Sequence, residues 1–292
     1  MSETPEQNKE KNKREKTRYL IIGFARSGTT VTHLALMGHP NVSALNGELR
    51  PEPFFTKGIS TFTFGNDPEE EKVKAYSALF DAITLIRANE NTFANGAKVV
   101  CNSNVLAQAL VTVLQNNMRD LKVIVIFRKD IVAQYGSGKI GKKSGIMHSW
   151  YKGYEGRKVE KIKINKWLFI AYAQSVRKMY EVLSELKNTH DVLEIHYEDL
   201  LVDANGLYAK IFRFLGLPQV EPTWLASKKV LPAPEDYIKN YSALQFELNR
   251  LENGTLPSHT LFISKTISRL YWRLSRIMPH NKSSMAKKRK KL

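Results

Sequence analysis

The sequence predicts an α/β protein whose parallel sheet is flanked by helices. Two patterns support this fold class. Short apolar runs, the clearest being "LKVIVIF" at 121–127, alternate with amphipathic segments of ten or more residues, which is typical of βαβ units. The first apolar run also ends in a glycine and passes directly into a helical pattern, as in P-loop proteins. Ligands are therefore expected at the carboxyl ends of the strands.

Each element has its own signal along the chain. Buried strands are expected at 19–23, 42–45, 96–103, 121–127 and 192–197. Helical periodicity predicts helices at 27–37, 70–90, 106–114, 167–186 and 209–215, with another that begins at 130. The stop signals "GHPN" and "GLP" end the first and the last of these helices. The intervening segment 41–70 is rich in proline and glycine and is expected to be loop-rich.

Composition sets the organisation of the chain. Its 292 residues, 42% of them hydrophobic, suffice for one large domain, which we expect over 18–256. Residues 1–17 have almost no apolar side chains and are predicted to form a disordered tail. We expect a basic amphipathic helix at 257–278 and a disordered basic tail at 279–292.

The cellular location is inferred from the low cysteine content and from the absence of an apolar signal or membrane-spanning segment in the sequence. Cys101 is the only cysteine, which excludes an internal disulfide and fits a reducing compartment. The N-terminus has no apolar signal segment, and no run reaches the ~18 apolar residues of a membrane span. A cytoplasmic location, either free or peripheral on the inner face of a membrane, is therefore expected.

The net charge of +17 is concentrated in two segments. Residues 139–166 hold nine basic and two acidic side chains, and residues 257–292 hold ten basic and no acidic ones. Such clusters attract polyanions, including anionic lipid, acidic glycan and nucleotides. The first cluster also contains Trp150, Tyr151 and Tyr154, so it is either a lid that binds an acceptor or a solvated insertion. The terminal cluster can alternatively serve solubility alone.

The first candidate site is the stretch "GFARSGTT". A strand that turns sharply into a helix aims backbone N–H groups at one point, where the helix dipole also favours an anion. Gly23 and Gly28 permit the turn, and Thr29 and Thr30 add hydroxyl donors. The spacing is that of a P-loop, but threonine replaces the lysine and the cation is Arg26 inside the loop. A kinase or nucleoside triphosphatase with an unusual loop, or a glycine turn without a ligand, remains an alternative.

The second candidate site is "FRKDIVAQYGS", which follows the strongest strand. Arg128 stands at the carboxyl end of that strand, and its planar guanidinium suits a phosphate. Asp130 can cap the next helix, and Ser137 lies about two helical turns along it, where it can close on the same anion. Two anion sites on neighbouring strands would suit a nucleotide that carries phosphates at both ends.

With both motifs in this order, the sequence resembles the sulfotransferases that use 3′-phosphoadenosine-5′-phosphosulfate (PAPS). "GFARSGTT" is similar to their 5′-phosphosulfate loop and "FRKDIVAQYGS" to their 3′-phosphate motif, while "YEDLL" and "IFRFLGLP" resemble segments that follow. The resemblance covers roughly residues 18–250 and implies the sulfotransferase fold, PAPS as the donor and no required metal. It implies that the donor is held by Arg26, Ser27, Gly28, Thr29, Thr30, Arg128, Ser137 and Tyr197, the first five at its 5′ end and Tyr197 near adenine.

Some positions depart from the pattern of the animal cytosolic enzymes. Ala25 stands where the first motif usually has proline, no proline follows Arg128, and Ser137 comes one position later than usual. The form R-K-D-x-V-x-Q-x-x-S is more similar to bacterial carbohydrate sulfotransferases of the trehalose type. The resemblance therefore implies a hydroxyl of a carbohydrate or glycolipid as acceptor, rather than a steroid or a phenol.

Sulfuryl transfer requires a base that deprotonates the acceptor hydroxyl. Glu48, Glu52, His33 and His39 are the candidates. Glu48 is preferred because it follows a glycine early in the loop after a short strand, and several sulfotransferases have a glutamate in this context. Arg26 is expected to neutralise the leaving phosphate oxygen. His39 also fits a helix stop, and His33 a position in the core.

The C-terminal helix separates its apolar and basic residues. Phe262, Ile263, Ile267 and Leu270 belong to one apolar side, with cations such as Lys265 mostly opposite. Such a helix either docks on the domain or lies on an anionic membrane surface. No nucleic-acid-binding motif accompanies the basic tail, so no specific nucleic acid is expected. A protein that binds anions without catalysis is a further alternative.

Overall fold

The computed structural model describes five segments of the chain, namely residues 16–45, 91–102, 104–144, 160–221 and 232–277. The chain divides into two compact units, the first from Met1–Val159 and Ser175–Pro232, the second from Glu160–Gln174 and Ala233–Leu292. Several predictions fall outside the described residues: most of the N-terminal tail, the loop with Glu48 and Glu52, the helix at 70–90, the aromatic cluster at 150–154 and the C-terminal tail.

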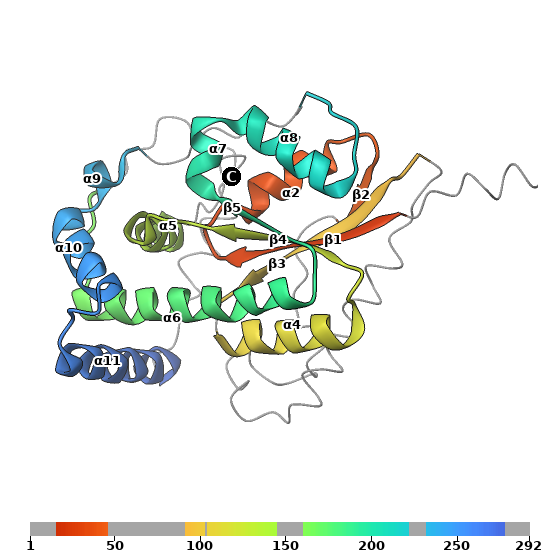
Figure 1. Ribbon diagram of the computed structural model, residues 1–292. Helices are drawn as coiled ribbons and strands as arrows, with labels where there is room; N and C mark the ends of the chain where they lie inside the picture. Colours follow the sequence, from red (N-terminus) through yellow and green to blue (C-terminus); the bar gives the residue numbers. More distant parts are fainter. Residues whose placement is uncertain (1–15, 46–90, 103, 145–159, 222–231, 278–292) are drawn as a thin grey trace, which may run out of the picture. The chain divides into compact units, whose positions relative to one another are not determined.

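The first unit is built on a parallel sheet of five strands in the order β2-β3-β1-β4-β5 (Figure 1). Its strands are β1 (Thr17–Phe24), β2 (Val42–Ala44), β3 (Ala94–Cys101), β4 (Lys122–Phe127) and β5 (Val192–His196). The predicted α/β class is confirmed, and each strand lies where an apolar run predicted it. β1 starts one residue before the expected domain boundary at 18.

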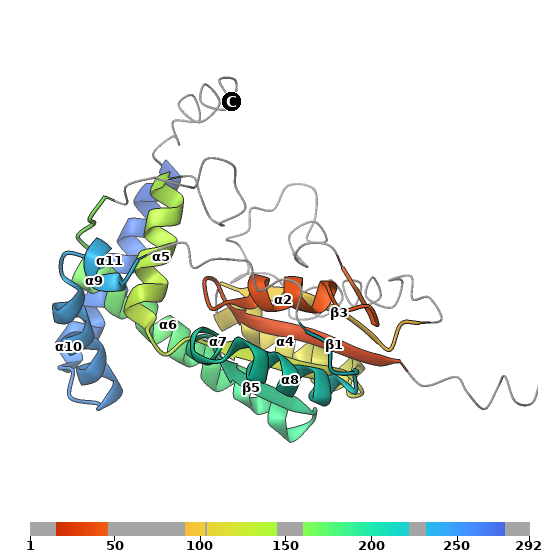
Figure 2. The ribbon, with the colours of Figure 1, turned by 90° about the horizontal axis from the view of Figure 1, so that it is seen from above.

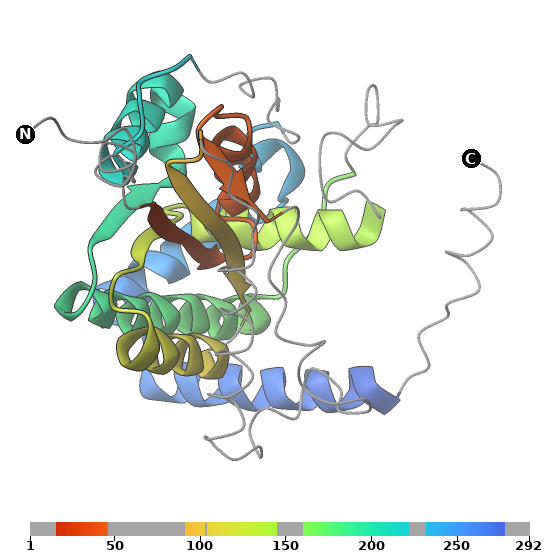
Figure 3. The same ribbon diagram turned by 90° about the vertical axis from the view of Figure 1, so that its right-hand side faces the viewer.

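Helices cover both faces of this sheet (Figures 1, 2 and 3). One face carries α2 (Thr29–Met37), α7 (Tyr197–Val202) and α8 (Ala204–Leu215). The other face carries α4 (Asn104–Asn117) and the second half of α6 (Lys166–Ser184), which continues into a short 3-10 helix at Glu185–Asn188. The helix α5 (Ile131–Ser144) begins shortly after β4.

A core cluster fills the space between the sheet and the helices α2 and α8. Alternate residues of a strand face the same side, so Tyr19 and Ile21 of β1 pack with Leu36, Ile211 and Phe212. The helix α8 ends at Leu215, and Gly216 directly after it has a left-handed φ of 70°, as expected for the predicted stop "GLP". Because α2 packs in this cluster, it lies on the sheet face to which Tyr19 and Ile21 point.

The second unit consists of the first half of α6 with α9 (Pro234–Tyr237), α10 (Tyr241–Glu252) and α11 (Ser258–Ile277). The Nζ of Lys166 lies 3.1 Å from a carboxylate oxygen of Glu247. The side chain of Asn240 accepts from the backbone N of Ile164 and donates to its carbonyl, at 3.0 and 2.9 Å. Within the described segments, no helix is long and apolar enough to cross a membrane.

Candidate active site

The strand order brings the two predicted anion sites to one place. β1 lies between β3 and β4, and in the β1–β4 pair Gly23 is in register with Ile126. The chain leaves β1 toward β2 and leaves β4 toward β5, on the opposite side of the sheet. A crevice outside the carboxyl ends of parallel strands forms where the connections diverge in this way. The stretch "GFARSGTT" follows β1 and "FRKDIVAQYGS" follows β4, so both motifs meet there.

The loop after β1 has an unusual backbone. Arg26 is the only non-glycine residue with a positive φ in the described segments, at 68°, and Gly28 follows at 97°. A Cβ on Gly28 would lie 2.8 Å from Cδ2 of Tyr197, so this position has no room for a side chain. The first turn of α2, which starts at Thr29, leaves N–H groups without intrahelical partners at this loop. A strained loop at a helix N-terminus is typical of an anion site.

Direct hydrogen bonds join the two motifs. The Nε of Arg26 donates to the Oγ of Ser137 at 3.0 Å. Arg128 donates from its guanidinium to the carbonyl oxygen of Arg26, also at 3.0 Å. A third bond, of 2.9 Å, runs from the side-chain amide of Gln134 to the carbonyl of Ala25. The structure thus brings Arg26, Arg128 and Ser137, from the two candidate sites, into direct contact.

Tyr197 lies in the same site. The guanidinium carbon of Arg128 is 4.6 Å from the centroid of the Tyr197 ring, within the range of a cation–π contact. The backbone N of Arg128 donates to the hydroxyl of Tyr180 at 3.3 Å. Burial raises the pKa of Tyr180 to about 12, so its phenol stays neutral. Tyr197 itself packs between Gly28 of the loop and Arg128.

Three residues that support the site, Glu198, Gln134 and Tyr180, were not singled out as candidates from the sequence. A carboxylate of Glu198 accepts from the backbone N of Lys129 and of Asp130, each at 3.1 Å, and so fixes the turn that carries Arg128. Gln134 and Glu198 lie within the recognised motifs, and this position was the only feature of the sequence that pointed to a role in the site. For Tyr180 the sequence offered none beyond helical periodicity.

Asp130 caps α5. Its carboxylate accepts from the backbone N of Ala133 at 2.8 Å, the bond that the capping interpretation requires. The helix that carries Ser137 therefore begins, with a capped first turn, three residues after Arg128.

Two buried polar atoms at the site suit an anionic ligand. The hydroxyl of Ser27 and the Nε of Arg128 are both buried and have no hydrogen-bond partner among the described residues. Such atoms are costly in a folded protein unless a ligand or water satisfies them. Because both are hydrogen-bond donors beside the loop, the site fits the phosphate groups of PAPS.

The two candidate histidines are committed to backbone partners. The Nε2 of His33 lies 2.8 Å from the carbonyl of Leu45, so this nitrogen carries the proton. The Nε2 of His39 lies 3.0 Å from the carbonyl of Pro218, and its Nδ1 accepts from the backbone N of Asn41 at 3.1 Å. These contacts favour the structural roles that the sequence also allowed: a core position for His33 and a helix stop for His39.

His33 makes stability dependent on pH. Burial is the main cause that lowers its pKa to about 4, from 6.5 in the unfolded chain. Between these values only the unfolded state binds the proton, so stability is full above pH 6.5 and falls as the pH decreases toward 4. From pH 7 to pH 5 this loss is about 2 kcal/mol. Urea unfolding of the wild type and His33→Gln at both values measures it, and equal losses in the two proteins would contradict it.

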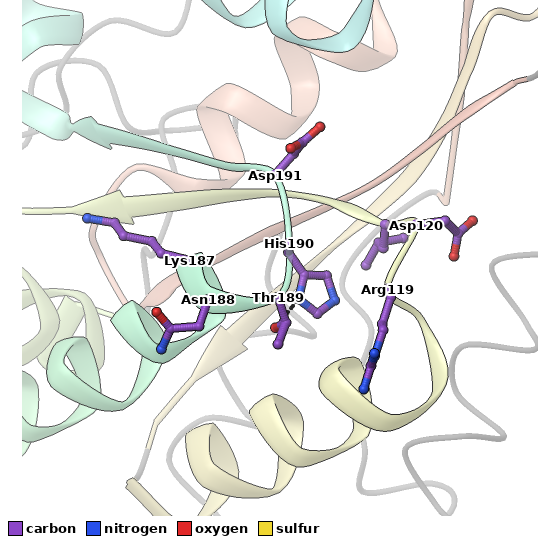
Figure 4. A pocket seen from close by; sticks show the side chains of 8 residues that line it. Arg119, Asp120, Lys187, Asn188, Thr189, His190 and Asp191 are labelled. Atoms are coloured by element: carbon purple, nitrogen blue, oxygen red, sulfur yellow. Dashed lines mark hydrogen bonds between the residues drawn. The ribbon is translucent and has the colours of Figure 1, made fainter.

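A separate hollow lies near the amino ends of the strands, at the opposite end of the sheet from the two motifs (Figure 4). It has a volume of about 390 Å³ and is lined by Arg119–Leu121 and Lys187–Asp191. Two of its charged groups have charged partners within the chain: Asp120 pairs with Arg18, and Lys187 lies 2.6 Å from Glu194. The hollow adjoins the amino ends of β4 and β5, away from the two motifs, so it is not part of the candidate active site.

Comparison with known proteins agrees with this geometry. The family model described as "Sulfotransferase family" matches residues 19–222. No curated protein matches the sequence at a significant level.

Solved structures of sulfotransferases are also similar to this chain, at low identity. One from Alicyclobacillus acidocaldarius is 16% identical, with a TM-score of 0.44, over 82% of this chain and 96% of that one. The sulfotransferase domain of the Synechococcus PCC 7002 olefin synthase is 16% identical, with a TM-score of 0.46, over 88% and 96%. One from Mycobacterium avium is 13% identical, with a TM-score of 0.46, over 82% and 77%.

Proposed function

Because this chain belongs to the sulfotransferase family, we propose that it transfers a sulfuryl group from PAPS to a hydroxyl of a carbohydrate or glycolipid. The observation that best supports the donor is the junction of the two motifs, in which Arg26 contacts Ser137 and Arg128 holds the carbonyl of Arg26. PAPS carries a phosphosulfate at one end and a phosphate at the other, and this junction provides cations for both.

The proposed reaction is an in-line displacement at sulfur, with electrostatics like those of phosphoryl transfer. The acceptor oxygen forms a bond to sulfur while the bond from sulfur to the 5′-phosphate oxygen breaks. That oxygen keeps the electron pair, and 3′-phosphoadenosine 5′-phosphate (PAP) leaves. Arg26 neutralises the charge that develops on the leaving oxygen. The acceptor proton passes to a base, for which we propose Glu48.

The remaining donors of the loop hold the 5′ end. The buried hydroxyl of Ser27, the hydroxyls of Thr29 and Thr30 and the N–H groups at the start of α2 are all hydrogen-bond donors. Arg128 and Ser137, which contact this loop, serve the 3′-phosphate, and Tyr197 lies beside Arg128. The proposal of a carbohydrate or glycolipid acceptor rests on the form of the second motif, R-K-D-x-V-x-Q-x-x-S.

Thermal unfolding with nucleotides tests the donor. PAP is expected to raise the melting temperature well above the effect of ATP with magnesium, because a ligand that binds only the folded state stabilises it. A larger shift with ATP and magnesium would instead support a kinase or triphosphatase. Transfer of labelled sulfate from PAPS to a panel of sugars and glycolipids then tests the reaction. Binding of PAP without transfer to any acceptor would favour an anion-binding protein without catalysis.

For the C-terminal helix we propose contact with an anionic membrane surface. In α11 the small polar side chains of Thr260 and Ser264 are buried. Phe262 and Leu270 are instead 71% and 56% exposed. The cations Lys265 and Arg269 of the same helix are exposed as well. Apolar side chains among cations on one helix suit a layer of anionic lipid headgroups.

Vesicle binding tests this surface. The double variant Phe262→Ser with Leu270→Ser is expected to bind vesicles of phosphatidylserine and phosphatidylcholine about 10-fold more weakly than the wild type, because it loses the apolar area that enters the headgroup layer. Phe246→Ser is the matched control, since Phe246 is similarly exposed, at 62%, but belongs to α10. Co-sedimentation measures the binding. Equal binding by all three proteins would refute the proposed contact.

A further inference from the structure

Lys98 lies beneath the phosphosulfate loop, although it belongs to neither motif. In the β1–β3 pair it is in register with Ile21, whose side chain packs in the core cluster shared with α2. Residues in register on parallel strands point to the same face. Lys98 therefore extends from β3 on the face where α2 begins.

The ammonium of Lys98 reaches this helix. Its Nζ lies 2.7 Å from the Oγ1 of Thr30, the second residue of α2. The lysine is only 6% exposed, and lysine is rarely buried to this extent without a specific interaction. The contact joins residues 68 positions apart in the sequence.

This bond determines which way the threonine hydroxyl acts. An ammonium has only donors, so the Oγ1 of Thr30 must accept from Lys98. The hydroxyl hydrogen of Thr30 then remains available to a second acceptor. At the N-terminus of α2, where N–H groups favour an anion, the natural second acceptor is a phosphate or sulfonate oxygen.

Lys98 also adds a cation to the loop besides Arg26. An ordinary P-loop has a lysine directly after its second conserved glycine, whereas this chain has Thr29 there. From the neighbouring strand, Lys98 brings an ammonium to the next residue, Thr30. Nearby His33 adds no second charge, because burial, with a smaller effect of Lys98, lowers its pKa to about 4.

We propose that Lys98 is a positioning residue for the sulfuryl donor, which orients the hydroxyl of Thr30 toward the 5′ end of PAPS and supplies positive charge behind the loop. The inference rests on the proposed function, since it concerns the same donor. It adds a third cation to Arg26 and Arg128, from a strand outside both motifs.

The test compares PAP binding and thermal stability. Lys98→Met keeps the length of the side chain and removes the charge, and it is expected to weaken PAP binding about 10- to 100-fold, as loss of a charged hydrogen bond would. The melting temperature without ligand should not fall, because methionine is easier to bury than an ammonium. Lys122→Met is the control: this lysine bonds the carbonyl of Phe214 at the amino end of β4 and should leave PAP binding unchanged.

Thr30 provides the second arm. Thr30→Ser keeps the hydroxyl and should retain PAP affinity, whereas Thr30→Val should lose it. If Lys98 acts through Thr30, the double variant Lys98→Met with Thr30→Val binds PAP no more weakly than the weaker single variant. Additive losses would overturn this route.

Other outcomes are also decisive. Unchanged PAP affinity in Lys98→Met would overturn the inference, while failure of the wild type to bind PAP would overturn the proposed function instead. If Lys98→Met does not fold, wild-type affinity in Thr30→Val overturns the inference by itself.

Discussion

Arg128→Ala is expected to weaken the binding of PAP about 100-fold, because it removes a guanidinium that can make charge-assisted hydrogen bonds to a phosphate. Its buried Nε has no partner in the described part of the chain, and its ring contact with Tyr197 holds the guanidinium plane at the site. Adenosine 5′-phosphosulfate lacks the 3′-phosphate, so the variant should bind this ligand almost as the wild type does. Isothermal titration of both ligands measures the difference.

The structure also provides the competing explanation for Arg128. Because its guanidinium donates to the carbonyl of Arg26, the substitution can disturb the loop itself. A disturbed loop would weaken both ligands equally, and that result would remove Arg128 from the 3′-phosphate role. Arg128→Lys should be intermediate, since lysine keeps the charge but lacks the planar fork. Lys129→Ala, at an exposed neighbouring position, controls for the loss of one positive charge.

Glu48→Gln is expected to lower kcat by about 10²- to 10⁴-fold while leaving the affinity for PAP unchanged, since a general base acts on the acceptor and not on the donor. Glu48 lies outside the described residues, but the segment that leads to it is well anchored. The backbone N of Leu45 donates to the carbonyl of Gly96 at 3.0 Å, and the carbonyl of Leu45 accepts from His33 at 2.8 Å. The chain thus leaves the carboxyl end of β2, at Ala44, four residues before Glu48.

Single-turnover assays with saturating PAPS separate this effect from donor binding. Glu52→Gln is the matched control, because it removes a carboxylate from the same loop four residues later. Full activity in Glu48→Gln would assign the proton to another base. A loss of the same size in both variants would indicate that the charge of the loop matters more than one particular carboxylate.

The sequence predicted those parts of the site that lie within one continuous segment. A glycine-bounded turn between a strand and a helix is a local feature, and so is an arginine after a buried strand with a serine two turns later. Asp130 belongs to the same class, because its capping bond to Ala133 spans only three residues. Local backbone geometry determines such features, so periodicity and spacing reveal them. Gln134 and Glu198 also lie within recognised motifs, but the motifs did not predict which backbone groups they would hydrogen-bond.

The α/β class, the strand positions and the residue types at both candidate anion sites were therefore predictable from the sequence. Which of these residues meet became clear from the arrangement of the strands. The contacts of Arg26 with Ser137 and of Lys98 with Thr30 span 111 and 68 residues, and both depend on β1 lying between β3 and β4. Hydrophobic periodicity is the same for a strand in any place in the sheet, so it cannot encode that order. Strand order follows from packing across the whole sheet, and this order joined Lys98, whose residue type and strand position fitted a structural role equally well, to Thr30 of the predicted loop.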